Sequence, residues 1–287
     1  MLPDARTPLD RANPIAISSK FQTVKDRLRG LDLEQYYRLR LKKRSHFELR
    51  LRGLKSNTDV ELLRDWNRNG QPELGEVVAS SRAPDRQKET INIQGLEPGT
   101  YFIRVFARAN QRTRYRLKLA ARPTSTTSFT YQVVQQTNAL RRERGLHPLA
   151  LNTQLSRSAQ TYTKAMATQD FFSHTGADGS TWQQRILATG YDFSSAAENL
   201  AIGYATPDRV IQGWMNSPGH RDNMLSVQVQ EIGVGYFYLD PDPGRITSYH
   251  YWAESFGTPA LTIQPSRGTN SRDRSRQQQS FFRKLDR

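Results

Sequence analysis

The sequence predicts two domains, an all-β sandwich followed by a domain of helices and antiparallel strands (α+β). Short runs that alternate apolar and polar residues fill most of residues 28–121, whereas helical spacing begins after a Pro/Ser/Thr-rich linker at 122–128. Strand-like alternation then returns near residues 231 and 248. A chain of 287 residues is also long enough for about two domains, each with its own core.

The first domain is predicted from five alternating runs, which are separated by turns rich in Gly, Pro and Asn. Because no helical crossover lies between the runs, a sandwich is favoured over a parallel sheet. The runs are YYRLRL (36–41), FELRL (47–51), TINI (90–93), YFIRVF (101–106) and YRLKL (115–119). Residues 1–27 are polar and aperiodic, and we predict a tail or linker there.

Four helices are predicted to open the second domain, at residues 129–258. Ser128 is placed to cap the first helix, and Asn152 or Thr153 the second. The third reads GSTWQQRILATG and ends at Gly190, and the fourth begins with Thr206 as its cap and Pro207 at its first position. The strands EIGVGYFYL and SYHYWAESFG follow. Residues 259–287 are polar and rich in Arg, which predicts a basic disordered tail.

The positive charge is concentrated in the first domain. The chain carries a net charge of +15, of which residues 1–122 hold +12, residues 123–259 hold −2 and the tail holds +5. Such a surface attracts polyanions, namely nucleic acid, anionic polysaccharide or anionic membrane, although it can also be merely solvated. No nucleic-acid motif is present, so specific nucleic-acid binding is not expected. The predicted outward-facing cations of the strands are Arg38, Arg40, Lys42, Arg50 and Arg52.

Cysteine is absent, which excludes disulfides, thiolate nucleophiles and Cys-ligated zinc. No apolar run approaches the length of about 20 residues that a membrane-spanning helix needs. The start, MLPDARTPLDRANP, lacks the apolar core of a signal peptide. We expect either that the protein is not exported by that route or that its leader is missing from this sequence.

Five motifs in order, between residues 129 and 257, carry a family resemblance: NALRRERGLHPLALNTQLSRSAQ, FFSHTGADGSTWQQRI, AENLAIGY, WMNSPGHRDNMLSVQVQEIGVGYFYLD and YHYWAESFG. Together they resemble the CAP superfamily (cysteine-rich secretory, antigen 5 and pathogenesis-related class 1 proteins) in its disulfide-free bacterial form. The resemblance implies an α-β-α sandwich with a central cleft. In many members two His and two acidic side chains line this cleft and can hold a divalent ion.

The resemblance implies that His174 of FFSHT, Glu198 of AENL and His220 of SPGH are metal ligands. The second acid of the family falls on Ser217 in this sequence, which cannot supply a carboxylate. We therefore predict that Glu231 replaces it, with Glu254 as a weaker candidate. Zn²⁺ with an open coordination position would suit this donor set.

His220 also has a physical argument for a ligand role. With Ser217 as N-cap and Pro218 at the first position, its ring lies in the first helical turn, where the helix dipole disfavours the charged form. A neutral imidazole is what a metal ligand needs. Taken alone, both His174 and His220 could instead be structural histidines. A sheet-face role is expected for His250.

The first domain resembles the bacterial pre-peptidase C-terminal domain, through the Gly-Thr-Tyr turn at 99–101 and the strand YRLKL at 115–119. That resemblance implies a small β-sandwich appended to secreted enzymes and adhesins. Some members bind calcium, and the nearest candidates here are Asp59, Glu61 and Asp65, which we interpret as ordinary strand and turn residues.

We therefore expect an extracytoplasmic binding protein, whose cleft holds a divalent metal and a hydrophobic or glycan ligand. Its basic sandwich would attach it to acidic surfaces, and the secreted or cell-envelope location rests on the resemblance. The alternative is a metal-assisted hydrolase acting on peptides or cell wall, with Glu198 or Glu231 as the base. No nucleophile elbow is present, which argues against a serine hydrolase. The aromatic residues of the second domain could line a ligand groove or pair across strands: Tyr191, Phe193, Tyr236, Tyr238, Tyr249, Tyr251 and Trp252.

Overall fold

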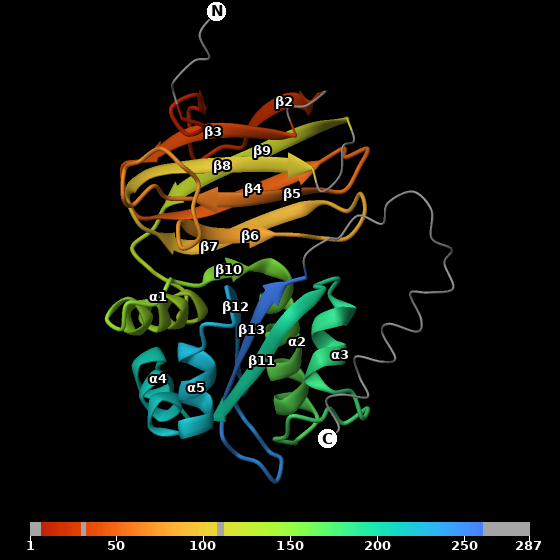
Figure 1. The fold of residues 1–287 in the computed structure, drawn as a ribbon. Helices are drawn as coiled ribbons and strands as arrows, with labels where there is room; N and C mark the ends of the chain where they lie inside the picture. The colour runs from red at the N-terminus through yellow and green to blue at the C-terminus, as the bar shows by residue number, and fades with distance from the viewer. Residues whose placement is uncertain (1–6, 30–32, 108–111, 261–287) are drawn as a thin grey trace, which may run out of the picture.

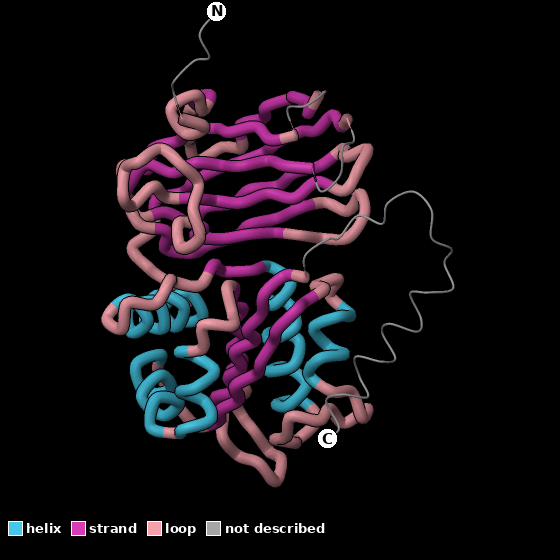
Figure 2. Tube along the Cα trace, in the orientation of Figure 1, coloured by secondary structure: helices cyan, strands magenta, loops and turns pink. Residues whose placement is uncertain are grey.

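The computed structural model describes residues 7–29, 33–107 and 112–260 (Figure 1). Strands fill the first part of this range, and the helices are confined to the second part (Figure 2). The β-rich region followed by a mixed α/β region confirms the predicted fold class. Residues 261–287, for which a disordered tail is predicted, lie outside the described residues.

The N-terminal region is a sandwich of two packed sheets. Its strands are β1 (Asn13–Pro14), β2 (Gln22–Leu28), β3 (Glu34–Leu41), β4 (Ser45–Arg52), β5 (Thr58–Leu63), β6 (Val77–Ser81), β7 (Glu89–Leu96), β8 (Gly99–Ala107) and β9 (Thr113–Pro123). One sheet has the order β2-β9-β4-β7, and the other contains β1-β3-β8-β5-β6. The alternating runs in the sequence form β3, β4, β7, β8 and β9, as predicted.

The C-terminal region has three layers. Its elements are α1 (Phe129–Arg142), β10 (Ala150–Asn152), α2 (Thr153–Thr168), α3 (Trp182–Ala188), β11 (Phe193–Ile202), α4 (Pro207–Asn216), α5 (Pro218–Leu225), β12 (Glu231–Tyr238) and β13 (His250–Pro259). Helices α1, α4 and α5 lie on one side of β12, β13 and β11, and α2 and α3 lie on the other (Figure 1). The predicted caps Ser128, Asn152 and Thr206 each accept a hydrogen bond from the first turn of their helix.

One sheet runs through both regions. Its order is β1-β3-β8-β5-β6-β10-β12-β13-β11, because the short strand β10 pairs in parallel with β6 on one side and with β12 on the other. One continuous apolar cluster likewise includes Leu49 and Ile103 of the sandwich together with Val134, Ile232 and Trp252 of the α/β region. The two regions thus share a sheet and a core. The domain boundaries given above stay a prediction.

The structure differs from the prediction in residues 13–28. Within this range Asn13–Pro14 form β1 and Gln22–Leu28 form β2 instead of a tail, and β2 pairs antiparallel with β9. The alternation in β2 is masked by Asp26, whose carboxylate accepts a hydrogen bond of 2.6 Å from the Tyr37 hydroxyl. Strands β5 and β6 also escape the pattern, because β5 is buried at every position and carries Asp59 and Glu61 inside the protein.

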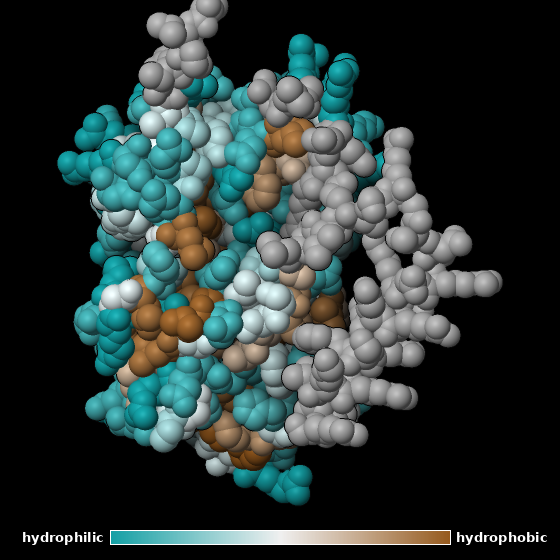
Figure 3. Space-filling view, in the orientation of Figure 1, coloured by the Kyte–Doolittle hydropathy of each residue, from teal (hydrophilic) through white to brown (hydrophobic). Residues whose placement is uncertain are grey.

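Close packing of α2 on β12 depends on two glycines. A Cβ atom at Gly233 would lie 2.1 Å from the backbone carbon of Leu155, and one at Gly235 would lie 2.3 Å from that of Ala159. The space beside these glycines is therefore filled by α2. None of the described helices is long and apolar enough to cross a membrane. The visible surface is mostly hydrophilic, with apolar groups near the boundary between the sandwich and α1 (Figure 3).

Candidate functional site

Three ionisable side chains meet at Glu198 on the edge strand β11. The Glu198 side chain is only 3% exposed, and its Oε1 accepts a hydrogen bond from His174 Nδ1 at 2.9 Å. Arg185 Nη2 lies 3.1 and 2.9 Å from the two carboxylate oxygens. His174 comes from the segment after α2 and Arg185 from α3, so the cluster joins three elements. The structure thus brings together two of the predicted site residues, with an arginine that was not predicted.

Arg185 is fixed in place by further contacts. Its Nη1 donates to the Ser180 carbonyl at 2.9 Å and its Nη2 donates to the His174 carbonyl at 3.0 Å. The guanidinium carbon lies 3.3 Å from the centre of the Tyr162 ring, which is a close cation–π contact. The cation is therefore part of a preorganised arrangement around Glu198.

A cavity of about 710 Å³ adjoins this cluster, because Arg185 and the Tyr162 ring against which it packs are both part of the cavity wall. Its walls come from α2, α3 and the segment between them; many of the lining residues are polar, but most of the surface that they expose to the cavity is apolar. The polar lining residues include Arg157, Thr161, Gln169, Asp178, Gln184 and Thr189, and apolar contact comes from Phe171 and several alanines. A cavity of this size accommodates a small molecule or part of a polymer.

His220 lies in the first turn of α5, as predicted. Burial, and secondly the charge of His174, lower the pKa of the His220 imidazole, which favours the neutral ring. The His220 carbonyl accepts a hydrogen bond of 3.0 Å from Asn199 Nδ2, and Asn223 Nδ2 donates to Asn199 Oδ1 at 2.9 Å, which ties α5 to β11. Ser217 occupies the N-cap position, but its side chain makes no capping hydrogen bond.

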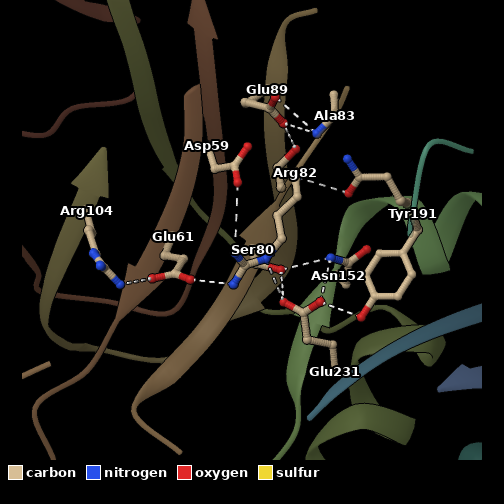
Figure 4. A network of polar contacts seen from close by, with 12 residues as sticks. Asp59, Glu61, Ser80, Arg82, Ala83, Glu89, Arg104, Asn152, Tyr191 and Glu231 are labelled. Atoms are coloured by element: carbon tan, nitrogen blue, oxygen red, sulfur yellow. Dashed lines mark hydrogen bonds and ion pairs between the residues drawn. The ribbon is translucent and has the colours of Figure 1, made fainter. Parts of the chain in front are cut away.

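Glu231 lies outside this cluster, in a buried network between the two regions (Figure 4). Its Oε1 accepts hydrogen bonds from Ser80 at 2.6 Å and from Arg82 Nε at 3.3 Å. Its Oε2 accepts from Asn152 at 3.1 Å and from the Tyr191 hydroxyl at 2.8 Å. Each oxygen of Glu231 thus accepts two hydrogen bonds. Ser80 and Arg82 belong to the N-terminal region, and Asn152 belongs to β10, which joins the two regions. The prediction that Glu231 completes the His174 and His220 site is not supported by this position.

The central cation of the network is Arg82, which is partly buried, with 18% of its side chain exposed. It also pairs with Glu61 at 2.6 Å and lies 3.9 Å from Asp59. Burial lowers the pKa of Arg82, but the carboxylates, Glu231 first, outweigh this effect and raise it overall. Asp59 and Glu61 are therefore structural partners of an arginine, in line with their interpretation as ordinary strand residues.

Two family models match the chain, each over one region. The model described as the cysteine-rich secretory protein family (CAP) matches residues 134–253. Residues 134–253 are a CAP domain. The model of the bacterial pre-peptidase C-terminal domain matches residues 34–107, so the β-sandwich is such a domain. Both resemblances read from the sequence motifs are confirmed.

The similar proteins cover only parts of this chain. A Bacillus subtilis protein, YkwD, is 37% identical over 114 residues, which are 40% of this chain and 44% of that protein. A second one, the membrane protein YlbC, is 30% identical over 104 residues, or 36% of this chain and 30% of that protein. The chain thus matches less than half the length of either relative.

Solved structures similar to this one also cover only part of the chain, between 38% and 54% for the three described below. An outer surface protein from Borrelia burgdorferi is 23% identical, covers 45% of this chain and 90% of its own, and gives a TM-score of 0.41. An extracellular protein with an SCP domain from Bacillus anthracis is 24% identical, covers 54% and 51%, and gives 0.40. The pre-peptidase C-terminal domain of a Bacillus anthracis collagenase is 18% identical, covers 38% and 94%, and gives 0.32.

The donors of this CAP domain do not fit the divalent ion that the family implies. Arg185 occupies both oxygens of Glu198, and a metal bound there would be repelled by the guanidinium. Ser217 stands where the family has its second acid, and Glu231 is held elsewhere. Among residues 7–29, 33–107 and 112–260, no group of three or more His, Cys, Asp or Glu side chains is arranged to hold a metal. We therefore derive no chemistry through a metal.

Glu254, the weaker candidate ligand, is also buried and engaged. It accepts hydrogen bonds from Asn199 Nδ2 at 3.0 Å and from the Thr137 hydroxyl at 3.3 Å. Burial raises the pKa of Glu254 to about 8, although both hydrogen bonds act in the opposite direction. At neutral pH it is therefore mostly protonated, which does not suit a metal ligand.

The aromatic residues of the CAP domain pair across strands more than they line a groove. Tyr191, Tyr251 and Trp252 are buried. The Tyr236 ring lies 4.3 Å from Trp252 and its hydroxyl lies 2.9 Å from His250 Nδ1, which gives His250 the expected sheet-face role. Burial lowers the pKa of the His250 imidazole.

Sequence reasoning missed Arg185, Arg157 and Arg82. Arg185 belongs to TWQQRI, where it looks like a solvated helix residue after the capping box of Thr181 and Gln184. One signal could have indicated Arg185. In the family fold the short helix α3 lies near the SHT and AENL motifs, so an arginine in its second half is within reach of their side chains. No pattern in the sequence indicates that Arg82 is partly buried and paired with carboxylates.

Proposed function

We propose that this protein is an extracytoplasmic binding protein whose CAP domain holds a glycan, and whose basic β-sandwich attaches it to acidic surfaces. The observation that carries the proposal is the cavity of about 710 Å³ next to His174, Glu198 and Arg185, which combines apolar surface with polar side chains. The extracytoplasmic location is supported by the pairing of a domain of the cysteine-rich secretory family with a bacterial pre-peptidase C-terminal domain.

The cavity lining favours a glycan over a lipid chain. Glycans are recognised by planar polar side chains and arginines around hydroxyl and amide groups, with an aromatic ring against an apolar sugar face. Arg157, Gln169 and Gln184 supply the first kind of contact, and Phe171 supplies the second. A lipid chain would cover the apolar part of the lining but would leave these polar groups without partners, whereas a sugar ring has both an apolar face and polar edges.

The alternative of a hydrolase has one observation in its favour. Glu198 orients the His174 ring through Nδ1, and the His174 side chain is 54% exposed, as a general base should be. However, no hydroxyl group of the described residues makes a hydrogen bond to the His174 ring. Binding is therefore the function that the geometry supports best.

The proposal is tested by titrating the tetrasaccharide of N-acetylglucosamine, as the first member of a glycan panel, into the full chain by calorimetry. We expect Arg157→Gln, at the cavity, to weaken binding at least tenfold. Lys164→Gln is the matched control, because Lys164 is exposed on the same helix and does not line the cavity. Peptide and peptidoglycan turnover is measured in parallel, and turnover abolished by His174→Ala would favour the hydrolase.

A further inference from the structure

The outer face of the sheet β2-β9-β4-β7 carries cations placed directly opposite one another. Lys25 of β2 faces Arg116 of β9, which on its other side faces Arg52 of β4. The neighbouring rows repeat the pattern with Arg27 opposite Arg114 and with Arg50 opposite Lys118. We call these seven residues the basic ladder: Lys25, Arg27, Arg50, Arg52, Arg114, Arg116 and Lys118.

This arrangement is unfavourable for the sandwich itself. Side chains directly opposite each other in a sheet lie about 5 Å apart at their Cβ atoms, and like charges in such pairs destabilise the sheet. Of the ladder residues in the described part of the chain, Arg50 has an ion pair, with Glu48 at 3.0 Å, and no ion pair is found for the other six. A surface that only needed to be soluble would alternate the two signs.

A hollow of about 440 Å³ continues the ladder at the end of β2 and β9. Its charged lining is entirely positive among the residues described: Arg27, Arg29, Lys55, Arg112 and Arg114. The other two lining residues are Leu28 and Thr113. The ladder and the hollow together form a track of cations along one face of the sandwich, with no acid among the described residues that line the hollow.

The cations that the sequence predicts to face outward are divided between two surfaces. Arg50 and Arg52 belong to the ladder, whereas Arg38 and Arg40 lie on β3, in the other sheet. Because the two sheets pack through their inner faces, these two pairs point away from each other. Arg38 and Arg40 face Phe102 and Thr100 instead of other cations. The opposed pairs are therefore a property of one face and not of the whole basic domain.

The chemistry of the ladder selects among the possible polyanions. The large apolar residues that are exposed in the described chain all lie outside β2, β4 and β9, so the face has no anchor for a membrane. The nearby Phe21 ring is covered by Arg50 at 4.7 Å and by Arg122 at 5.7 Å, and is not free to stack on a nucleobase. A flat sheet face also does not enter a groove of duplex DNA as a helix or ribbon does.

We propose that the basic ladder binds a linear, carboxylated polysaccharide that lies across β2, β9 and β4. Arginine forks bind carboxylates through two parallel hydrogen bonds, and the rows repeat every 4.8 Å or so between strands and about 6.8 Å along them, which suits regularly spaced charges. This inference rests on the proposed attachment to acidic surfaces and names its partner and its location. The polymer relieves the repulsion within the ladder when it binds.

The test compares two triple variants of the full chain with equal loss of charge. Lys25→Gln/Arg52→Gln/Arg116→Gln removes one complete row, and Arg38→Gln/Arg40→Gln/Lys42→Gln removes three exposed cations near the other sheet. Binding of fluorescent alginate oligosaccharide is measured by anisotropy over a range of salt concentrations, together with the melting temperature of each variant. Duplex DNA of equal total charge and anionic vesicles serve as competitors.

We expect the row variant to bind alginate at least tenfold more weakly at low salt, with a salt dependence reduced by about one unit for each cation that contacted the polymer. Its melting temperature should equal or exceed that of the wild type, because two repulsive pairs are gone. The control variant should change affinity less than twofold. Equal weakening by both variants, or stronger binding of DNA or vesicles than of alginate, would overturn the inference. A wild type that binds no polyanion would overturn the proposed attachment as well.

Discussion

Replacing Glu231 by Ala separates the structural role of this residue from the ligand role that the sequence suggests. The substitution removes the acceptor of four hydrogen bonds, from Ser80, Arg82, Asn152 and Tyr191. Glu231 is only 3% exposed, so water does not readily replace its carboxylate. The Arg82 cation keeps Glu61 but loses its bond to Glu231.

The expected loss of stability is large. Removing one partner of a buried ion pair costs about 3–5 kcal/mol, because the remaining charge is left without compensation. For a chain of this length each kcal/mol lowers the melting temperature by about 2–4 °C, so we expect a decrease on the order of 10 °C. The network lies where β6, β10 and β12 join, so the unfolding of the sandwich and of the CAP domain should become less cooperative.

Differential scanning calorimetry of the wild type and Glu231→Ala, each with EDTA and with zinc, measures this effect. The control is His174→Ala/His220→Ala, which changes the other predicted ligands without touching the network and should lower the melting temperature little. An unchanged melting temperature for Glu231→Ala would refute the structural role. A stabilisation by zinc that disappears in Glu231→Ala would restore the ligand role predicted from the sequence.

Three further substitutions test other parts of the structure. Arg185→Gln frees both oxygens of Glu198, so zinc affinity measured by calorimetry should rise at least tenfold; a wild type that binds zinc equally well would contradict the conclusion that Arg185 prevents Glu198 from holding a metal. Glu254→Gln should flatten the pH dependence of stability. Because the pKa of Glu254 is raised, the native state holds one proton more than the unfolded state between about pH 4.5 and 8. The stability of the wild type should therefore fall as the pH rises toward 8. Melting curves at pH 5, 6.5 and 8 show whether the wild type alone has this slope. Gly235→Ala should cost about 1–3 kcal/mol in urea unfolding because of the α2 backbone, whereas Gly219→Ala, whose Cβ meets open space, should be neutral or stabilising.

Sequence patterns predict the fold well where a single face of an element is buried. Strands β3 and β9 alternate over Tyr37–Leu41 and Thr113–Leu119, and α4 combines a Thr206 cap with Pro207 at its start, so both kinds of element could be predicted directly. Strand β5 could not be predicted in this way, because it buries the carboxylates of Asp59 and Glu61. These are compensated by Arg82 and Arg104, which are distant in sequence. The short strand β10 is only recognisable through its partners, so the continuous sheet could not be predicted.

The candidate site was predictable only in part, for a similar reason. The motifs around His174, Glu198 and His220 indicate which residues face the cleft, and the structure joins His174 to Glu198. Whether a carboxylate is free depends on its neighbours in space. Arg185 for Glu198 and Arg82 for Glu231 are such neighbours, and their chain positions carry no mark of it.

The central claim is that the CAP domain binds a glycan in the cavity between α2 and α3 without the help of a divalent metal. Titration calorimetry of the N-acetylglucosamine tetrasaccharide and the wider glycan panel into the wild type, once in EDTA and once in zinc, tests it most directly. The account predicts that a glycan binds with the same affinity in both buffers and that Arg157→Gln weakens this binding. Binding that requires zinc, or the absence of binding by every glycan in the panel, would contradict it.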